Sequence, residues 1–159
     1  MILYHGSNIE IREPKLLQSK RFLDFGYGFY LTSDLDQAKK WANHTTELRG
    51  EGFAVVSCFE IDDDELSNLK TLTFPKANKT WLKYVAANRK GLPVKGSYDL
   101  VIGPVANDQT FRVVSQFVRG LFSINVAIMM LMPQKLKDQY AFKTEKAIRM
   151  LNFMEVISV

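Results

Sequence analysis

The sequence predicts an α+β fold in a single domain that spans residues 1–159. Short segments rich in β-branched and aromatic residues alternate with stretches of helical periodicity. The connections vary in length, so they do not form the regular βαβ rhythm of a doubly wound sheet. No repeat or low-complexity linker marks a domain boundary. A chain of 159 residues, 47% hydrophobic, can bury one full core but is too short for two ordinary domains.

Three strands are expected in the first half of the chain. Residues 2–6 (ILYHG) form a short strand ended by glycine, and a loop-rich connection follows. Residues 28–32 (GFYLT) form a second strand or its stub. Residues 53–62 (FAVVSCFEID) show the clearest strand composition and are closed by the acidic cluster 62–65.

A helix is expected between the second and third strands, ending at about Arg49. Ser33 or Asp34 can cap its N-terminus, because both side chains accept hydrogen bonds from the first-turn amides. Trp41 shares one face with Leu35 and two alanines at helical spacing, so we expect it to point inward.

The second half of the chain alternates in the same way. The expected elements are helix 79–89, strand 98–103, a helix from 107 or 108 to about 121, a short helix within 124–136, strand 139–144, helix 145–151 and strand 153–159. Asn107 or Asp108 is the expected cap of the second of these helices, and Thr144 of the last.

Composition excludes several classes of protein. The lone cysteine, Cys58, rules out an internal disulfide and lies in a segment where a buried apolar role is expected. No secretory signal is visible at the N-terminus, and the longest apolar run, 124–132, is about half of a membrane span, so we expect a cytoplasmic protein. The net charge of +4 is spread among acidic residues, which favours a solvated surface while permitting a nucleic-acid partner.

The common catalytic motifs are absent. The segment GYGFYL matches only two glycines of the dinucleotide fingerprint and is not followed directly by a helix, so the Rossmann interpretation fails. Two histidines, His5 and His44, cannot supply the three protein ligands that catalytic zinc generally needs. No G-x-S-x-G motif occurs, which leaves a set of aromatic, histidine and small polar residues.

These remaining residues have informative spacing. The segment LYHGS near the N-terminus, then DFGYGFYLTSDLDQAKKWA, then QYAF resembles the ADP-ribosyltransferase superfamily, in the branch of poly-ADP-ribose polymerases and diphtheria toxin. With YDLVIGPVAND and TEKAIRMLNF added, nearly the whole chain is similar to a bacterial family in that clan, domain of unknown function 3990.

The resemblance implies a split sandwich of two mostly antiparallel sheets with NAD held between them. It gives His5 the role of binding the adenosine ribose, Gly6 that of receiving the nicotinamide amide on its backbone, and Ser7 that of assisting at the ribose. Tyr30 and Trp41 take the places of two aromatics that hold nicotinamide between them.

The third position of the His-Tyr-Glu triad departs from the family pattern. Gln139 in QYAF stands where the family has a glutamate that stabilises the oxocarbenium-like transition state. An amide can bond a ribose hydroxyl but offers no full negative charge. Glu145 could substitute, although its place also fits a first-turn acid favoured by the helix dipole, and we rank Gln139 first.

The leading hypothesis is therefore a mono-ADP-ribosyltransferase that uses NAD, needs no metal and modifies a protein or nucleic acid. The alternative is a catalytically silent module of the same fold that binds NAD or a protein. The family context also raises a bacterial toxin neutralised by a small antitoxin-like partner, for which no residue of this sequence argues.

Overall fold

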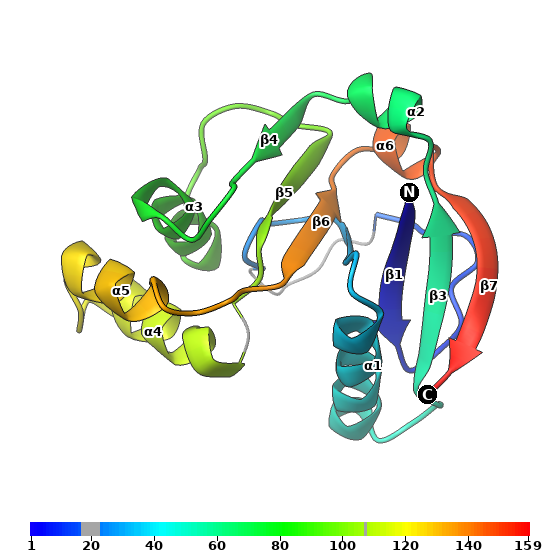
Figure 1. The fold of residues 1–159 in the computed structure, drawn as a ribbon, viewed down its shortest axis with the longest axis horizontal. Helices are drawn as coiled ribbons and strands as arrows, with labels where there is room; N and C mark the ends of the chain where they lie inside the picture. The colour runs from blue at the N-terminus through cyan, green and yellow to red at the C-terminus, as the bar shows by residue number, and fades with distance from the viewer. Residues whose placement is uncertain (17–22, 107) are drawn as a thin grey trace.

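A computed structural model describes residues 1–16, 23–106 and 108–159 and contains two β-sheets side by side (Figure 1). The α+β class expected from the sequence is confirmed. The first sheet is antiparallel, in the order β1 (Ile2–Ser7), β3 (Val55–Glu60), β7 (Asn152–Ser158). The second has the order β2 (Phe29–Leu31), β6 (Asp138–Phe142), β5 (Leu100–Pro104), β4 (Thr71–Thr73), with only β4 and β5 parallel.

The described helices flank the two sheets. They are α1 (Leu35–Arg49), α2 (Asp63–Ser67), α3 (Lys79–Arg89), α4 (Asp108–Val118), α5 (Ile124–Leu131) and α6 (Glu145–Ile148). In Figure 1, α1 packs beside the three-stranded sheet, whereas α3, α4 and α5 form a lobe on the far side of the four-stranded sheet. The four-stranded sheet therefore lies between the other sheet and this helical lobe.

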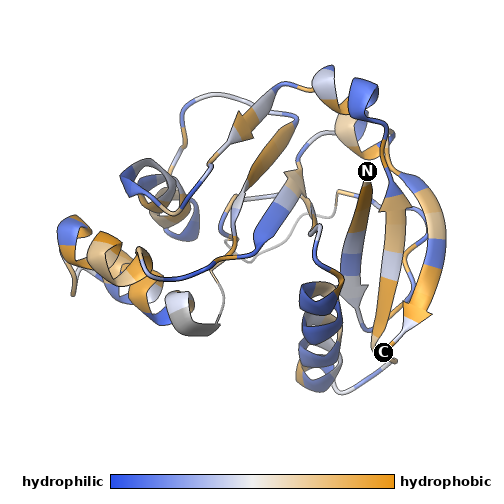
Figure 2. Ribbon diagram, viewed as in Figure 1, coloured by the Kyte–Doolittle hydropathy of each residue, from blue (hydrophilic) through white to orange (hydrophobic). Residues whose placement is uncertain are grey.

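The four-stranded sheet is buried on both faces. Phe29, Leu31 and Phe142 face the first sheet and pack with Leu3 and Phe59 there. Residues on the opposite face pack with α3, α4 and α5 in a second cluster that contains Val101, Ala141 and Trp81 and is bordered by Tyr30. Figure 2 shows β5 of this sheet and β3 of the other as mostly hydrophobic, whereas α1 is largely hydrophilic. Successive residues of β2 thus face different clusters, because side chains alternate across a strand.

The two sheets are joined along β1 and the end of β2. Tyr4 and Thr32 exchange two backbone hydrogen bonds, of 2.9 and 3.0 Å. Within the described residues this bridge is one residue pair long. Strands β1, β2 and β6 consequently run side by side, although β1 belongs to a different sheet.

Asp138 secures the turn that leads from β2 into α1. Its carboxylate accepts hydrogen bonds from the Thr32 hydroxyl and from the backbone amide and hydroxyl of Ser33. Asp34 caps α1 by accepting from the Gln37 amide at 2.8 Å, and it forms an ion pair with Lys137. Of the two expected caps, Asp34 is the one used.

Helix α1 packs on the first sheet through small residues. Ala38 and Ala42 are buried against it, and a Cβ on Gly6 would lie 2.0 Å from the Ala38 carbonyl oxygen. The expectation that Trp41 points inward is wrong, since its side chain is 57% exposed and lies against the His44 ring. The close approach of helix and strand leaves no room for an indole on the contact face.

Several boundaries differ from expectation. Helix α2 and strand β4 were not expected, because five and three residues are too few to show periodicity. Helix α6 has its expected Thr144 cap, and Cys58 is buried as expected. The expected cap at Asn107 lies outside the described residues. Among those that are described, no helix is long and apolar enough to cross a membrane.

The contact of Gly6 with α1 is directly testable. Gly6→Ala should lower the free energy of unfolding by about 1–3 kcal/mol, because the added methyl group meets helix backbone that cannot move aside. Urea denaturation measures the change. Asn43→Ala, an exposed position on α1, is the control and should change it by less than about 0.5 kcal/mol. Equal stability of both variants would contradict the packing of α1 on β1.

Candidate functional site

The three residues predicted to form a His-Tyr-Gln triad lie on three neighbouring strands. His5 is on β1, Tyr30 on β2 and Gln139 on β6. The Tyr4–Thr32 bridge joins β1 to β2, and Tyr30 pairs with Ala141 of β6, two residues from Gln139. The fold thus gathers onto adjacent strands residues that are 25 and 109 positions apart in the sequence.

His5 is held by the backbone of β2. Its Nδ1 donates a hydrogen bond to the Tyr30 carbonyl oxygen at 2.7 Å, and its ring stacks on Phe29 with centroids 4.5 Å apart. Burial lowers the pKa of His5, and Arg49 adds a smaller effect in the same direction, while the bond to Tyr30 opposes both. The imidazole is therefore neutral at pH 7, with the proton on Nδ1.

The Nε2 atom of His5 is then an acceptor. Among the described residues no hydrogen-bond partner of Nε2 is found, and the His5 side chain is half-buried. A neutral imidazole in this arrangement accepts a hydrogen bond from a hydroxyl group of a ligand.

The His5 bond lies where the bridge between β1 and β2 ends. Continuing the ladder would bring Gly6 opposite Tyr30, and at this place the Tyr30 carbonyl oxygen accepts from the imidazole. Backbone groups in an antiparallel strand alternate in direction, so the N–H and C=O of Gly6 point to the same edge as those of Tyr4. This edge faces the His5–Tyr30 junction.

Tyr30 is fixed at its hydroxyl end. The hydroxyl donates to the Gly26 carbonyl oxygen at 2.5 Å and accepts from the Phe25 amide at 3.1 Å. Burial raises the pKa of the phenol, with nearby Asp24 a smaller cause. Gly26 has φ = 76°, a conformation that favours glycine and lets the turn 24–28 fold back onto Tyr30.

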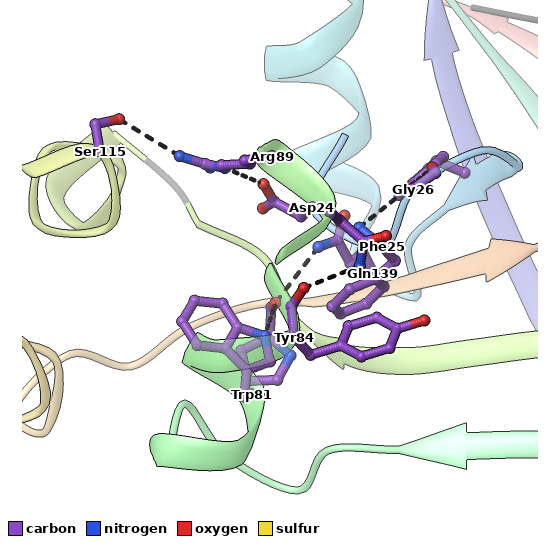
Figure 3. Close-up of polar contacts among 11 residues, drawn as sticks. Asp24, Phe25, Gly26, Trp81, Tyr84, Arg89, Ser115 and Gln139 are labelled. Carbon is purple, nitrogen blue, oxygen red and sulfur yellow. Dashed lines mark hydrogen bonds and ion pairs between the residues drawn. The ribbon is translucent and has the colours of Figure 1, made fainter. Parts of the chain in front are cut away.

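Gln139 is buried on the face of β6 that meets the helical lobe. Its amide donates to the Pro104 carbonyl oxygen at 3.4 Å, and the Trp81 indole donates to the same oxygen at 2.9 Å (Figure 3). The residue predicted to take the place of a catalytic acid is therefore a neutral donor, and its partner carbonyl also anchors the start of α3.

An ion pair that sequence reasoning missed lies beside this group. Arg89 binds Asp24 at 2.6 Å, with both side chains 13% exposed, and reaches the Ser115 hydroxyl at 3.4 Å (Figure 3). The Arg89 guanidinium also lies over the Phe111 ring at 4.8 Å. It ties the turn 24–28 to α3 and α4. The sequence carries no local signal of the pair, because its two members are 65 residues apart.

Of the remaining residues predicted for the site, one lies close to His5, Tyr30 and Gln139, and two do not. Ser7 is buried at the end of β1, two residues from His5, so the fold keeps it near the triad. No ring contact joins Trp41 to Tyr30 among the described residues. Glu145 occupies the first turn of α6, beyond the opposite end of β6 from Gln139.

Two hollows on the surface lie elsewhere. One is lined by Met1, Glu60, Ile61, Asp62, Asp63 and Asn152, and the other by Glu10, Arg12 and Glu13. None of the residues predicted for the site lines either of them. In the part of the chain that the structure describes, no three histidine, cysteine or acidic residues gather in a way that could hold a metal ion.

A family model described as a protein of unknown function, DUF3990, matches residues 1–153. The chain belongs to this family. The strands that carry His5, Tyr30 and Gln139 all lie within the DUF3990 match. No curated protein and no solved structure matches the chain. DUF3990 membership thus covers the site but attaches no activity to it.

The neutral state of His5 predicts a pH dependence of stability. Its pKa in the folded protein lies below the ordinary 6.5, so the unfolded chain binds the proton first as the pH falls. The free energy of unfolding should decrease between about pH 7.5 and about pH 5.5, as urea denaturation will show. His5→Asn, which keeps an amide near the Nδ1 position, should remove most of this decrease.

The other histidine provides the control. His44 is exposed on α1, and His44→Asn should leave the pH dependence as in the unsubstituted protein. A decrease that persists in His5→Asn, or vanishes in His44→Asn, would contradict the assignment to His5.

Proposed function

We propose that this protein is an NAD-dependent mono-ADP-ribosyltransferase, which cleaves the bond between nicotinamide and ribose and transfers ADP-ribose to a macromolecule. The observation that supports it most is the neutral His5, anchored through Nδ1 on the Tyr30 carbonyl, with no partner of Nε2 found among the described residues. Gln139 on the next strand completes the three positions of the family resemblance.

The proposal assigns a separate task to each group. His5 Nε2 accepts a hydrogen bond from a hydroxyl of the adenosine ribose, with Ser7 assisting nearby. The amide of nicotinamide pairs with the backbone N–H and C=O of Gly6, which point to the edge beside His5. Tyr30 contributes its ring, which the bonds of its hydroxyl to the turn 24–28 hold in one orientation.

The structure changes the reason for glycine at position 6. The resemblance attributes it to the approach of nicotinamide, whereas a Cβ here would collide with the backbone of α1. The proposal uses only the backbone of Gly6, so it does not depend on that reason. Trp41, exposed on α1, has the weakest geometric support among the residues assigned to NAD.

Gln139 limits the chemistry. As nicotinamide leaves, positive charge develops on the ribose, and a glutamate would stabilise it more than a neutral amide does. The difference is worth roughly 2–4 kcal/mol, or about one and a half to three decades of rate. We therefore propose slow transfer of single ADP-ribose units.

A second candidate function is a module that binds NAD or a protein without turnover. The observation in its favour is the contact of Gln139 with the Pro104 carbonyl, which gives the amide a structural role that needs no reaction. Isothermal titration with NAD and an assay of nicotinamide release distinguish the two. Binding without release would support the module.

His5 offers a paired test of NAD binding. His5→Asn keeps a donor near Nδ1 but loses Nε2, so NAD affinity should fall about tenfold, the value of one hydrogen bond to a ligand. His5→Gln brings an amide near the Nε2 position and should recover part of the affinity. Isothermal titration measures all three proteins. Equal affinity of His5→Asn and the unsubstituted protein would exclude His5 from the NAD site.

Gln139→Glu tests the reaction itself. The carboxylate should raise the rate of nicotinamide release by about tenfold or more, because it opposes the developing positive charge. It should also cost about 1–3 kcal/mol of stability, since it replaces a donor by an acceptor beside the Pro104 carbonyl. Gln139→Ala, which removes the amide without adding charge, is the control. If folded Gln139→Glu released nicotinamide no faster than the unsubstituted protein, the proposed role of this position would be contradicted.

A further inference from the structure

The net charge of +4 conceals a strong division of charge along the chain. Residues 75–137, which include α3, β5, α4 and α5, carry ten lysines and arginines against two aspartates. The rest of the chain carries eleven basic against fifteen acidic residues. Residues 75–137 therefore have a net charge of +8 and the remainder of the chain −4. A field of one sign attracts a partner of the opposite sign.

Part of this charge forms a row along α3. Lys79, Lys83 and the C-cap residue Lys90 lie within about 40° of one another around the helix axis. All three are exposed, and no ion pair with any of them is found among the described residues. Arg89, about 100° around the helix axis from Lys90, is the basic residue of α3 that is neutralised, by Asp24.

The length of the row identifies the kind of ligand. Three lysines over eleven helical rises extend about 16 Å, which is too long for one phosphate or carboxylate group to contact. A linear polyanion with closely spaced charges can meet all three. Double-stranded DNA carries one negative charge per about 1.7 Å of its axis and releases counterions when lysines bind it.

The composition of the same face favours nucleic acid over an acidic protein. None of the exposed large hydrophobic side chains lies on α3, whereas a protein interface needs buried apolar or aromatic anchors at its centre. Exposed methionines such as Met129 and Met132 do occur in the lobe, but in and just after α5. A row of point charges without anchors is typical of contacts to a phosphate backbone.

We propose that the lysine row of α3 (Lys79, Lys83 and Lys90) binds the phosphate backbone of a nucleic acid. This binding does not require the proposed transferase. Trp81 of α3, which donates to the Pro104 carbonyl that also holds Gln139 (Figure 3), lies on the opposite side of the helix from the three lysines. The row therefore faces away from the contact that fixes α3 next to Gln139, and a nucleic acid would lie on the outer face of this helix.

The test uses fluorescence anisotropy with labelled DNA of about 20 bases, as a single strand and as a duplex, across a range of NaCl concentrations. The variant Lys79→Gln/Lys83→Gln/Lys90→Gln should raise Kd by about tenfold or more at low salt. It should also reduce the slope of log K against log salt by about two units for the single strand and about three for the duplex. Comparing the two DNA forms shows which one the row prefers.

The matched control removes the same charge outside the lobe. Lys15→Gln/Lys40→Gln/Arg149→Gln changes three exposed positions and should leave Kd and the salt slope close to those of the unsubstituted protein. Equal weakening by both triple variants would overturn the proposal, because binding would then follow net charge alone. Polyglutamate is the second comparison. If it bound as tightly as DNA, and if the triple lysine variant weakened its binding as much as that of DNA, the proposal would be overturned in favour of an acidic protein. Both DNA measurements proceed without NAD, so their outcome is independent of the transferase proposal.

Discussion

The hydrogen bond from His5 Nδ1 to the Tyr30 carbonyl oxygen is the interaction around which the candidate site is organised. It lies next to the Tyr4–Thr32 bridge, where the pairing of β1 with β2 ends. The two sheets share this one short junction in place of a continuous ladder. The same bond fixes the imidazole tautomer, so the contact beside the junction also sets the chemical character of the histidine.

The rest of the fold supports this junction from both sides. Asp138 binds Ser33, the second residue after β2, and Asp34 caps the N-terminus of α1 at the next position. These two contacts fix the start of α1, which packs closely against Gly6. On the other face, the hydroxyl of Tyr30 is bonded to the turn that the Asp24–Arg89 ion pair ties to the helical lobe. Because both faces of β2 are anchored, a strand of three residues can present Tyr30 in a defined position.

Membership in DUF3990 gives the chain a family but no activity, so the chemistry must be argued from the site. The site holds a neutral acceptor, a fixed aromatic and a buried amide on adjacent strands, which suits the recognition of a nucleoside more than the activation of a nucleophile. The basic residues are concentrated in one part of the chain, residues 75–137. The helical lobe lies on the Gln139 side of the four-stranded sheet, and its lysine row faces outward from that sheet.

The sequence by itself determined the α+β class, most helices and strands, and the capping residues Asp34 and Thr144, because these follow from local periodicity and hydrogen bonding. It did not predict α2 and β4, which are too short to show periodicity. It also predicted that Trp41 points inward, because helical spacing alone cannot show whether the buried face of a helix has room for a large side chain. Only the tertiary structure decided that Tyr30 accepts from His5, that Gln139 shares a carbonyl with Trp81, and that Arg89 pairs with Asp24. His5 and Tyr30 are 25 positions apart in the chain, and Asp24 and Arg89 are 65 apart, while Gln139 and Trp81 meet at the carbonyl of a third residue. No local pattern encodes which distant groups the folded backbone brings together.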